Sequence, residues 1–495
     1  MSADSSKKVE PSISADSACR VRSERFRQHF PKSKNTGLGS IRTPQLLHLH
    51  SGKVRESFRV DNRHRLLIVT DRISCFDRIL DSPIPGKGAV LNGISAFWFQ
   101  KTRDICPSHF VRVVDPNAAL VREARPIRVE MVVRGYLTGS AWRAYEKGKR
   151  EFSGVPLPDG LTRNQKFLRP ILTPTTKEKS DREIAPGEIV SSGLATEAQW
   201  MRMSELSLSL FERGTAELVP RNLLLIDTKY EFGIIDGEVA LIDEIHTTDS
   251  SRFWFADSYA DDPDSVKSLD KEFVRQWLLD HKLPDGTLPT DIPADVSNEA
   301  RCRFFDLFRQ ITGAELPVQI DDPRERLAAN LVREGLIRDS FVAVVMGSAG
   351  DKEFGKRIKM ALEPFNVFVA MRVVSAHKNG ERLVELAEEY NKAIEPGVVI
   401  AVAGRSNGLG GALAANLNIP VINCPPFKNL ADYSVNIHSS LQMPSETPAL
   451  TILSPEGAAL AAIRCLNRHR LRDLASVRVA DVKARLIEDD RAFGE

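Results

Sequence analysis

Two cations follow a glycine early in the chain, in the run Gly52-Lys53-Val54-Arg55. Side chains alternate between the two faces of a strand, so Lys53 and Arg55 share one face if this segment is extended. Two cations on one face can hold a polyphosphate. The same pattern also fits an exposed sheet edge that carries solvated charges. The run predicts one or the other and does not choose between them.

A second charged run, Asp227-Thr228-Lys229-Tyr230-Glu231, has the same period of two. The period places Asp227, Lys229 and Glu231 on one face of a strand. In proteins Mg²⁺ takes one or two carboxylates together with phosphate oxygens, so two acids around a lysine favour a magnesium and phosphate site. The alternative is a solvated ladder of ion pairs.

Two further acids, Asp243 and Glu244, follow an apolar run at 239–242. Asp236-Gly237 before that run predicts a two-residue hairpin turn. An ideal hairpin of this type pairs Glu231 with the last residue of the run. It then places Glu244 nearer the face of Glu231, whereas a β-bulge would favour Asp243. The register therefore leaves the second candidate metal ligand undecided.

Three loops in the C-terminal half follow predicted apolar strands. The turn at 347–351 opens a helix, and such a turn either cradles a phosphate or serves as a plain helix cap. His377 stands at a strand end beside Lys378, where a catalytic and a structural role are both open. The loop at 404–411 is rich in glycine, which permits close approach of the backbone to a ligand.

The elements that must position these residues differ between the two halves. Residues 46–313 mix short β-rich runs with charged loops, as is typical of an α+β fold with antiparallel pairing. A helix with Ser297 as its expected N-cap closes this half. From residue 340, continuously apolar strands alternate with segments of helical spacing, which predicts an α/β doubly wound parallel sheet. Ligands of such sheets bind beyond the carboxyl ends of the strands.

A polar stretch separates these two textures. We therefore expect a disordered N-terminal tail over residues 1–40, a first domain over 41–314, a linker over 315–339 and a second domain over 340–495. One compact core does not hold a chain of this length, so two domains also agree with size scaling.

The composition narrows the class of protein. The 495 residues carry 68 lysines and arginines against 66 acids, a net charge of +2. A chain whose charges are so nearly balanced gives no general reason to expect nucleic acid or an anionic membrane as a partner. No run reaches the roughly 20 apolar residues of a membrane helix. The six cysteines are scattered without zinc-ligand spacing, which favours reduced thiols and a cytoplasmic location.

Six fragments of the first half occur in a specific order: GKVRESF, TDRISCFD, IPGKG, VVRGYLTGSAW, DTKYEFG and IDEIHTTDSSRFW. Together they resemble the SAICAR synthetases (phosphoribosylaminoimidazole-succinocarboxamide synthases) of de novo purine biosynthesis. The resemblance implies an α+β, ATP-binding SAICAR synthetase-like domain. It also implies an ATP-dependent ligation of the carboxylate of carboxyaminoimidazole ribotide to the amine of L-aspartate, through an acyl phosphate.

The resemblance also implies roles for individual residues. The ATP contacts would be Lys53, Arg55, Lys229 and the segment around Glu130. The Mg²⁺ ligands would be Glu231 and Asp243, a choice that the hairpin register left open. The contacts to the ribotide and nearby substrate would be Arg134, Ser140, Asp249, Arg252, Ser74 and Asp77.

The fragments MGSAGD, SAHK, AGRSNGLG and CPP in the second half resemble AIR carboxylase, a flavodoxin-like domain. SAHK with AGRSN is similar to the class that uses CO₂ directly, without biotin, metal or ATP. The resemblance implies that His377 moves the proton and Lys378 steadies CO₂ or the new carboxylate. It implies substrate contacts at Ser348, Asp351, Ser375, Ser406, Asn407 and Gly408. Gly350 and Glu446 depart from the family pattern, which reads serine and glycine there.

We therefore expect a bifunctional enzyme that carboxylates aminoimidazole ribotide and then ligates the product to aspartate. Its partners would be small molecules, with no nucleic acid and no membrane, and a homo-octamer would form through the carboxylase domain. Two alternatives remain at this point. The second half could be a mutase acting on the N5-carboxy ribotide, or a decayed ribotide-binding scaffold or sensor beside an active ligase.

Overall fold

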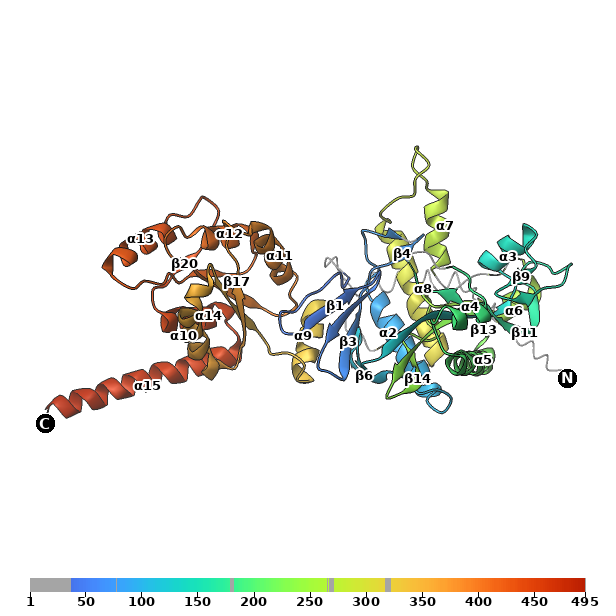
Figure 1. The fold of residues 1–495 in the computed structure, drawn as a ribbon, viewed down its shortest axis with the longest axis horizontal. Coiled ribbons are helices and arrows are strands. Elements are labelled where there is room, and N and C mark those ends of the chain that lie inside the picture. Colours follow the sequence, from blue (N-terminus) through green and yellow to red (C-terminus); the bar gives the residue numbers. More distant parts are fainter. Residues whose placement is uncertain are drawn as a thin grey trace, which may run out of the picture. The chain divides into compact units, whose positions relative to one another are not determined.

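The computed structural model describes residues 37–76, 78–178, 182–264, 266, 271–316 and 322–494. The chain divides into two compact units (Figure 1). The first contains 50–57 and 61–322 together with the residues up to Gly39. The second contains 40–49, 58–60 and 323–495. Most of the tail expected at 1–40 lies outside the described residues, and the expected domain limits stay predictions.

The first unit contains two main sheets, although Leu47–Leu49 of β1 and Phe58–Arg59 of β2 are counted with the second unit. The smaller has the strand order β1-β2-β3-β7-β6, and the larger has the order β11-β8-β13-β14, with β12 added to β8 and β15 added to β13. Every described pairing in the larger sheet is antiparallel. The main strands are β1 (Leu47–Ser51), β2 (Arg55–Arg59), β3 (His64–Val69), β6 (Phe110–Asp115), β7 (Ala118–Arg122), β8 (Arg125–Tyr136), β11 (Lys166–Leu172), β12 (Thr175–Thr176), β13 (Leu223–Ile235), β14 (Glu238–Ile242) and β15 (Ser251–Phe255).

The predicted hairpin joins β13 to β14. Asp236 and Gly237 both have positive φ angles, 51° and 89°, as a two-residue turn with left-handed central residues requires. The hairpin pairs Glu231 with Ile242, which is the register of the ideal turn. The short strands of the unit are β4 (Ser74–Cys75), β5 (Arg78–Ile79), β9 (Glu151–Phe152) and β10 (Val155–Pro156).

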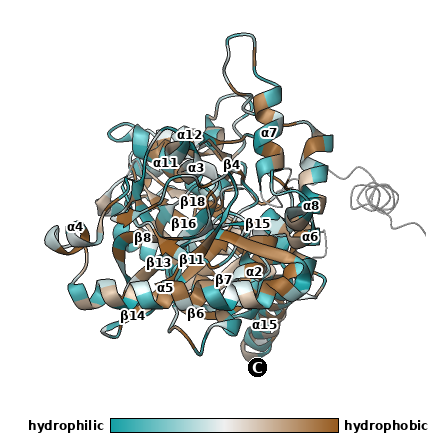
Figure 2. Ribbon diagram, turned by 90° about the vertical axis from the view of Figure 1, so that its right-hand side faces the viewer, coloured by the Kyte–Doolittle hydropathy of each residue, from teal (hydrophilic) through white to brown (hydrophobic). Residues whose placement is uncertain are grey.

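Helices cover these sheets and close a large apolar core around Trp98, Tyr230 and Phe253. In α7 apolar and polar turns alternate (Figure 2), because only its Val274 and Leu278 face is buried. The helical segments are α2 (Lys87–Lys101), α3 (Gly139–Glu146), α4 (Pro186–Ser191), α5 (Glu197–Leu218), η1 (Val219–Arg221), α6 (Ala256–Asp261), α7 (Glu272–Asp280) and α8 (Ala294–Thr312).

The expected N-cap of the closing helix is wrong. The helix α8 begins at Ala294, and Pro293 occupies its N-cap. The backbone N–H of Ser297 donates to Pro293 O at 3.0 Å, so Ser297 already lies in the first turn. The fixed φ of Pro293 and the carboxylate of Asp295 in that turn both favour the earlier start.

The second unit is the predicted doubly wound sheet. Five parallel strands lie in the order β17-β16-β18-β19-β20, where β16 is Phe341–Met346, β17 Phe368–Val373, β18 Gly397–Val402, β19 Val421–Asn423 and β20 Leu450–Thr451. Every residue of β16 and β18 is buried. Alternate residues of β16 belong to separate cores, Val342 to one and Ala343 to the other, so both faces of the sheet are covered.

Helices α10 (Lys352–Leu362) and α14 (Pro455–Leu466) contribute to the first of these cores, and α11 (Gly380–Asn391) and α12 (Gly408–Asn416) to the second. No described helix is long and apolar enough to cross a membrane. The remaining helical segments of the second unit are α9 (Pro323–Arg333), η2 (Ala349–Asp351), η3 (Glu363–Phe365), α13 (Leu430–Leu441) and α15 (His469–Gly494).

An N-terminal segment, residues 40–49, belongs to the second unit although it lies far from it in sequence. Thr43 Oγ1 donates to Glu395 Oε1 at 2.6 Å, and Gln45 Nε2 donates to Arg338 O at 2.9 Å. Glu395 is buried, and burial raises the pKa of its carboxyl group. The hydrogen bond from Thr43 therefore satisfies an acceptor that water does not reach freely.

Two histidines lie in the core of the first unit. His246 is fully buried, and its Nε2 lies 2.6 Å from the Tyr230 hydroxyl, with its ring 4.7 Å from that of Trp98. Burial lowers the pKa of His246 to about 3 and that of His109 to about 4. Both side chains are therefore neutral in the folded protein at neutral pH.

Acid should destabilise the first unit through His246. Folding lowers its pKa from 6.5, so the stability it contributes is complete above pH 6.5 and is lost as the pH falls toward about 3. The slope is about 1.4 kcal/mol per pH unit for one proton. His246→Gln should remove that slope between pH 6 and 4.5 in urea unfolding followed by tryptophan fluorescence. All five tryptophans lie between residues 98 and 277, so the signal reports on this unit. An unchanged slope would contradict the prediction.

Candidate active sites

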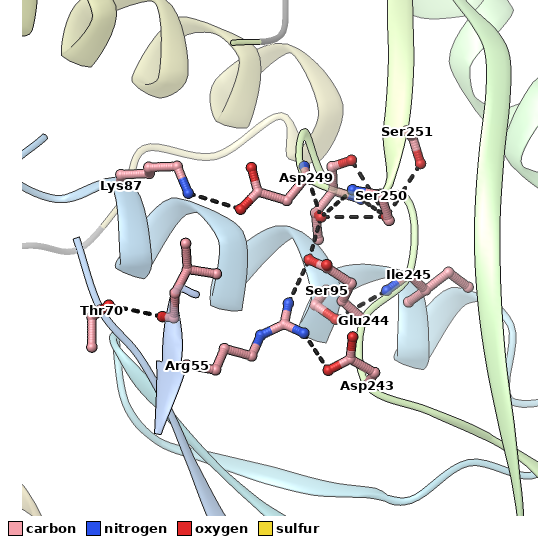
Figure 3. A network of polar contacts seen from close by, with 12 residues as sticks. Arg55, Thr70, Lys87, Ser95, Asp243, Glu244, Ile245, Asp249, Ser250 and Ser251 are labelled. Carbon is pink, nitrogen blue, oxygen red and sulfur yellow. Dashed lines mark hydrogen bonds and ion pairs between the residues drawn. The ribbon is translucent and has the colours of Figure 1, made fainter. Parts of the chain in front are cut away.

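Arg55 lies between two carboxylates in the first unit. It forms ion pairs with Asp243 and with Glu244, at the turn that follows β14 (Figure 3). Burial alone would raise the pKa of Asp243, but Arg55 and Lys177 hold it below its ordinary value. Thr247 Oγ1 also donates to Glu244, so that carboxylate is committed to bracing the turn.

Glu231, on β13, lies close enough to Asp243 for their charges to interact. Burial, and then the charge of Asp243, raise the pKa of Glu231 to about 7. Lys177 forms an ion pair with Glu231. Asp243 has a φ of 67°, so the strand alternation stops there and the ideal hairpin register does not extend to it. This explains why Asp243 lies close enough to act on Glu231 although the ideal register favoured Glu244.

The donor set fits a hard divalent cation bound with phosphate. Two carboxylates of like charge lie near each other, and a cation would relieve their repulsion. Among the described residues no group of three or more His, Cys, Asp or Glu could hold a metal ion. Two carboxylates completed by phosphate oxygens match the binding habit of Mg²⁺ rather than a cage made wholly of protein.

Further cations surround this pair. Lys229 Nζ donates to Glu130 Oε1 at 3.0 Å, and Glu130 lies directly across the sheet from Glu231. Burial would lower the pKa of Lys229, but Glu130 and Glu231 outweigh it and raise the pKa. The segment around Glu130 was expected to contact ATP, and in the structure the Glu130 side chain is the partner of Lys229. Lys177 was missed by sequence reasoning, although it follows the Thr-rich run at 173–176 next to β8.

The prediction that Lys53 and Arg55 share one face of a strand is wrong. The backbone N–H of Gly52 donates to Arg55 O at 2.7 Å, which closes a turn, so Lys53 lies in a bend and β2 begins at Arg55. Arg72 braces this turn, because its guanidinium donates to Gly52 O at 3.1 Å and pairs with the buried Glu56 at 3.1 Å. Lys53 is exposed on the turn.

Two arginines flank one acid in a row across the larger sheet. Asp227 on β13 lies opposite Arg134 on β8 and opposite Arg252 on β15, with ion-pair distances of 3.5 and 3.3 Å. A Cβ on Gly139 would lie 2.0 Å from Arg252 Nη1, so the guanidinium packs directly over this glycine. The exposed Ser140 follows in the first turn of α3. The structure thus brings together Arg134 and Arg252, two of the residues expected at the ribotide, and Ser140 follows the glycine on which Arg252 packs.

Asp249 is held by two lysines. The fully buried Lys87 donates to its Oδ2 at 2.9 Å (Figure 3), and Lys271 Nζ lies 3.6 Å from its Oδ1. Burial would raise the pKa of Asp249, but the lysines lower it well below its ordinary value. Neither lysine was predicted, although Lys87 is the lysine of IPGKG. Ser74 lies half-buried in β4, and Asp77 lies outside the described residues.

In the second unit the structure brings two of the predicted loops together. A Cβ on Gly408 would lie 2.8 Å from both Cε1 and Nε2 of His377, so the imidazole packs against this glycine. His377 and Lys378 are exposed in the turn after β17, and Gly408 opens α12 after β18. The two loops lie at the carboxyl ends of β17 and β18, the strands on either side of β16, as predicted for a parallel sheet. Ser375 begins the same turn, and its N–H donates to Asn379 Oδ1 at 2.8 Å.

The turn after β16 is a capped helix start. Ser348 Oγ accepts from Gly350 N at 3.1 Å, and burial raises the pKa of Asp351. A Cβ on Gly350 would meet only Ser348 Oγ, at an ordinary 3.4 Å, so the turn would also admit the serine that is usual there. Glu446 differs, because it has a φ of 59° where the resembled family has glycine. A residue with a Cβ is disfavoured in that region by about 1–2 kcal/mol.

The loop at 404–410 borders a cavity of about 750 Å³ lined by Arg405, Ser406, Asn407, Gly408, His438 and Gln442, among others. Asn407 is 3% exposed, and its carboxamide is used internally. Its Oδ1 accepts from Gly410 N at 3.1 Å, and its Nδ2 donates to Ser440 Oγ at 2.9 Å. The side chain of Asn407 therefore shapes the loop, whereas that of Ser406 is exposed.

Comparisons with known proteins agree with the two units. The SAICAR synthetase family matches residues 48–286, and the AIR carboxylase family matches residues 341–484. A phosphoribosylaminoimidazole-succinocarboxamide synthase from Legionella pneumophila is 43% identical over 275 residues, which cover 53% of this chain and 87% of that protein. One from Bacteroides fragilis is 43% identical over 279 residues, covering 54% and 87%. A solved SAICAR synthase from Saccharomyces cerevisiae is 32% identical, covers 56% and 97%, and has a TM-score of 0.51.

The chain therefore belongs to the SAICAR synthetase family through its first unit, and its second unit is an AIR carboxylase domain. The pairing of the two domains in one chain defines a bifunctional enzyme of purine biosynthesis, with a ligase half and a carboxy-lyase half.

Removing the buried cation beside Asp249 should destabilise the first unit. Lys87→Met keeps the length of the side chain and leaves Asp249 short of its nearest partner, which costs about 3–5 kcal/mol when a buried pair is broken. Adding Asp249→Asn removes the stranded charge and should recover part of the loss. Urea unfolding followed by tryptophan fluorescence measures both variants. A single variant as stable as the unaltered protein would show that Lys271 alone neutralises Asp249.

Proposed function

We propose that this enzyme carboxylates aminoimidazole ribotide with CO₂ and then joins the product to L-aspartate with ATP. The observation that carries the proposal is the coexistence of two different sites. The first unit concentrates cations around two interacting carboxylates, Glu231 and Asp243. The second places an imidazole against a glycine loop at the carboxyl end of a parallel sheet.

In the ligation, a carboxylate oxygen of the ribotide attacks the γ-phosphorus of ATP, and ADP leaves. The amine of aspartate then attacks the acyl carbon, phosphate leaves and the amine gives up a proton. Lys53, Arg55, Lys229 and the segment at Glu130 would bind ATP, and Glu231 with Asp243 would hold Mg²⁺. That cation neutralises phosphate charge when bound. Lys177, now paired with Glu231, can turn to phosphate when the carboxylate has a cation as partner.

The arginine row would hold the ribotide. Arg134 and Arg252 present two guanidiniums on either side of Asp227, beside Ser140, and guanidiniums suit phosphate oxygens. Asp227 keeps the two like charges together before an anion arrives. Asp249, Ser74 and Asp77 would contact the nearby parts of the substrate.

In the carboxylation, C4 of the aminoimidazole forms a bond to CO₂, and the proton on C4 leaves as the ring regains its double bonds. His377 would take that proton. Lys378 and Ser406, with backbone at Gly408, would hold the new carboxylate. Ser348, Asp351 and Ser375 would bind the ribotide, and Asn407 would shape the pocket. Lys378 and the Arg405-Ser406-Asn407 run favour CO₂ over an N5-carboxylated ribotide as the source of the carboxyl group.

Two reciprocal variants test the assignment. Glu231→Gln should lower ligation by roughly 10²-fold or more while leaving carboxylation intact, because it removes a ligand beside developing charge. His377→Asn should lower carboxylation by about 10²–10⁴-fold while leaving ligation intact, because it removes the proton acceptor. Each reaction is assayed alone, ligation from supplied carboxylated ribotide and carboxylation from bicarbonate without ATP.

Exposed residues of the same types provide the matched controls, Glu238→Gln on β14 and His469→Asn on α15, and both should behave as the unaltered enzyme. Carboxylation that required an N5-carboxylated ribotide would replace the CO₂ assignment with the mutase alternative. Ribotide binding without any carboxylation would favour a decayed second half, in which Gly350 and Glu446 are the residues to restore first.

We also propose that the enzyme is cytoplasmic and assembles as a homo-octamer through the carboxylase unit. The support for assembly is α15, a helix of 26 residues in which only Leu471 is buried. Apolar side chains along it are exposed in the single chain: Val477, Val482, Leu486, Ile487 and Phe493. A second copy would cover this surface, since large exposed apolar patches mark association sites.

The charge variant Leu486→Asp should lower the mass measured by light scattering, because it places a carboxylate in the apolar contact. Arg491→Asp, on the other side of the same helix, is the control and should leave the mass nearly unchanged. An unaltered enzyme that is monomeric and active would reject assembly through α15.

A further inference from the structure

The loop after β18 is anchored by one buried carboxamide. Asn436, in the middle of α13, is 6% exposed. Its Oδ1 accepts from the backbone N–H of Arg405, and its Nδ2 donates to Pro426 O at 2.6 Å. One side chain thus joins the loop after β18 to the segment after β19.

The anchored backbone is in a conformation that it would not adopt readily alone. Arg405 has a φ of 57°, in the left-handed region that residues with a Cβ disfavour. The bond to Asn436 holds its N–H in that orientation. The preceding Gly404 makes room for the anchor, because a Cβ there would lie 2.9 Å from Asn436 Nδ2.

The same face of α13 supplies a second anchor. Ser439 and Ser440 stand three and four residues after Asn436, so the three side chains share one face of the helix. Asn407 N donates to Ser439 Oγ at 2.6 Å, and Asn407 Nδ2 donates to Ser440 Oγ at 2.9 Å. Residues 405 and 407 are therefore both fixed to α13, and Ser406 lies between them.

We propose that Asn436 is a positioning residue for carboxylation. It fixes the turn at Gly404 and Arg405 so that Ser406 and the backbone at Gly408 face the reacting carboxyl group beside His377. Asn436 bonds to the loop and to Pro426 and acts only through that loop. The proposal rests on the carboxylation described above and adds the residue that holds its pocket in shape.

The test compares three variants with the full-length enzyme in carboxylation from bicarbonate. Asn436→Leu, similar in size, should lower kcat by roughly tenfold to a hundredfold, since small misplacements near the chemistry cost that much. The KM for the ribotide should change less than about threefold, because Ser348 and Asp351 lie on another loop. Asn436→Asp keeps an acceptor for Arg405 N–H and should recover most of kcat. Gly404→Ala, which pushes on the carboxamide from the other side, should reproduce the loss.

Asn429→Ala is the matched control. Asn429 is the N-cap of the same helix, and its Oδ1 accepts from Asp432 N at 2.9 Å. It should lower the stability of α13 without the fall in kcat. Ligation from supplied carboxylated ribotide serves as the internal measure of folded enzyme and should be unchanged in every variant.

The outcomes separate the two claims. An unaltered enzyme that does not carboxylate would overturn the proposed function itself. If it does carboxylate, a folded Asn436→Leu variant with full kcat would overturn the positioning role. So would an equal loss of kcat in Asn429→Ala, because the effect would then belong to the stability of the helix.

Discussion

Acids in the interior of the first unit require cations within reach, and this constraint organises its site. Arg55 lies between Asp243 and Glu244, and these ion pairs connect β2 of the smaller sheet to the turn after β14 of the larger one. Asp249 in turn forms ion pairs with Lys87 and Lys271. A buried charge without a partner is costly, so each buried carboxylate of the proposed site needs a basic residue beside it. The cation-rich site is therefore assembled before any anionic substrate binds.

In the second unit, backbone geometry and hydrogen bonds between neutral groups hold the loops of the site in place. The fully buried strands β16 and β18 fix where two of the three loops emerge, and β17, paired with β16, fixes the third. The loops are then shaped by local contacts: Ser348 caps one turn, and Asn407 is tied to Gly410 and α13. Neutral contacts suit the proposed role of this site, because CO₂ carries no charge. The two sites therefore differ in electrostatic character, although the net charge of the whole chain is only +2.

The sequence predicted the architecture well where periodicity is strong. Continuous apolar runs predicted the parallel sheet, and Asp236-Gly237 predicted the hairpin and its register. Two local predictions failed because a turn and a helix start lie at other residues than the pattern indicated. Lys53 left the predicted strand because Gly52 closes a turn with Arg55, and α8 began before Ser297. The partners of the acids, Lys87, Lys177 and Lys271, could not be read from spacing, because they come from separate segments. The choice between Asp243 and Glu244 depended on one left-handed residue, which no residue-type rule specifies at an aspartate.

The early segment that joins the second unit has a consequence for how the protein forms. Residues 40–49 are synthesised early, yet their hydrogen-bond partners, Glu395 and Arg338, are made some three hundred residues later. In chain order the largest part of the synthetase unit, residues 61–322, therefore stands between two parts of the carboxylase unit. The first unit can complete its core while the ribosome is still translating, whereas the second must wait for both of its parts. A fragment starting at residue 323 would leave the buried Glu395 without Thr43 and Gln45, so residues 40–49 are a structural part of the second unit.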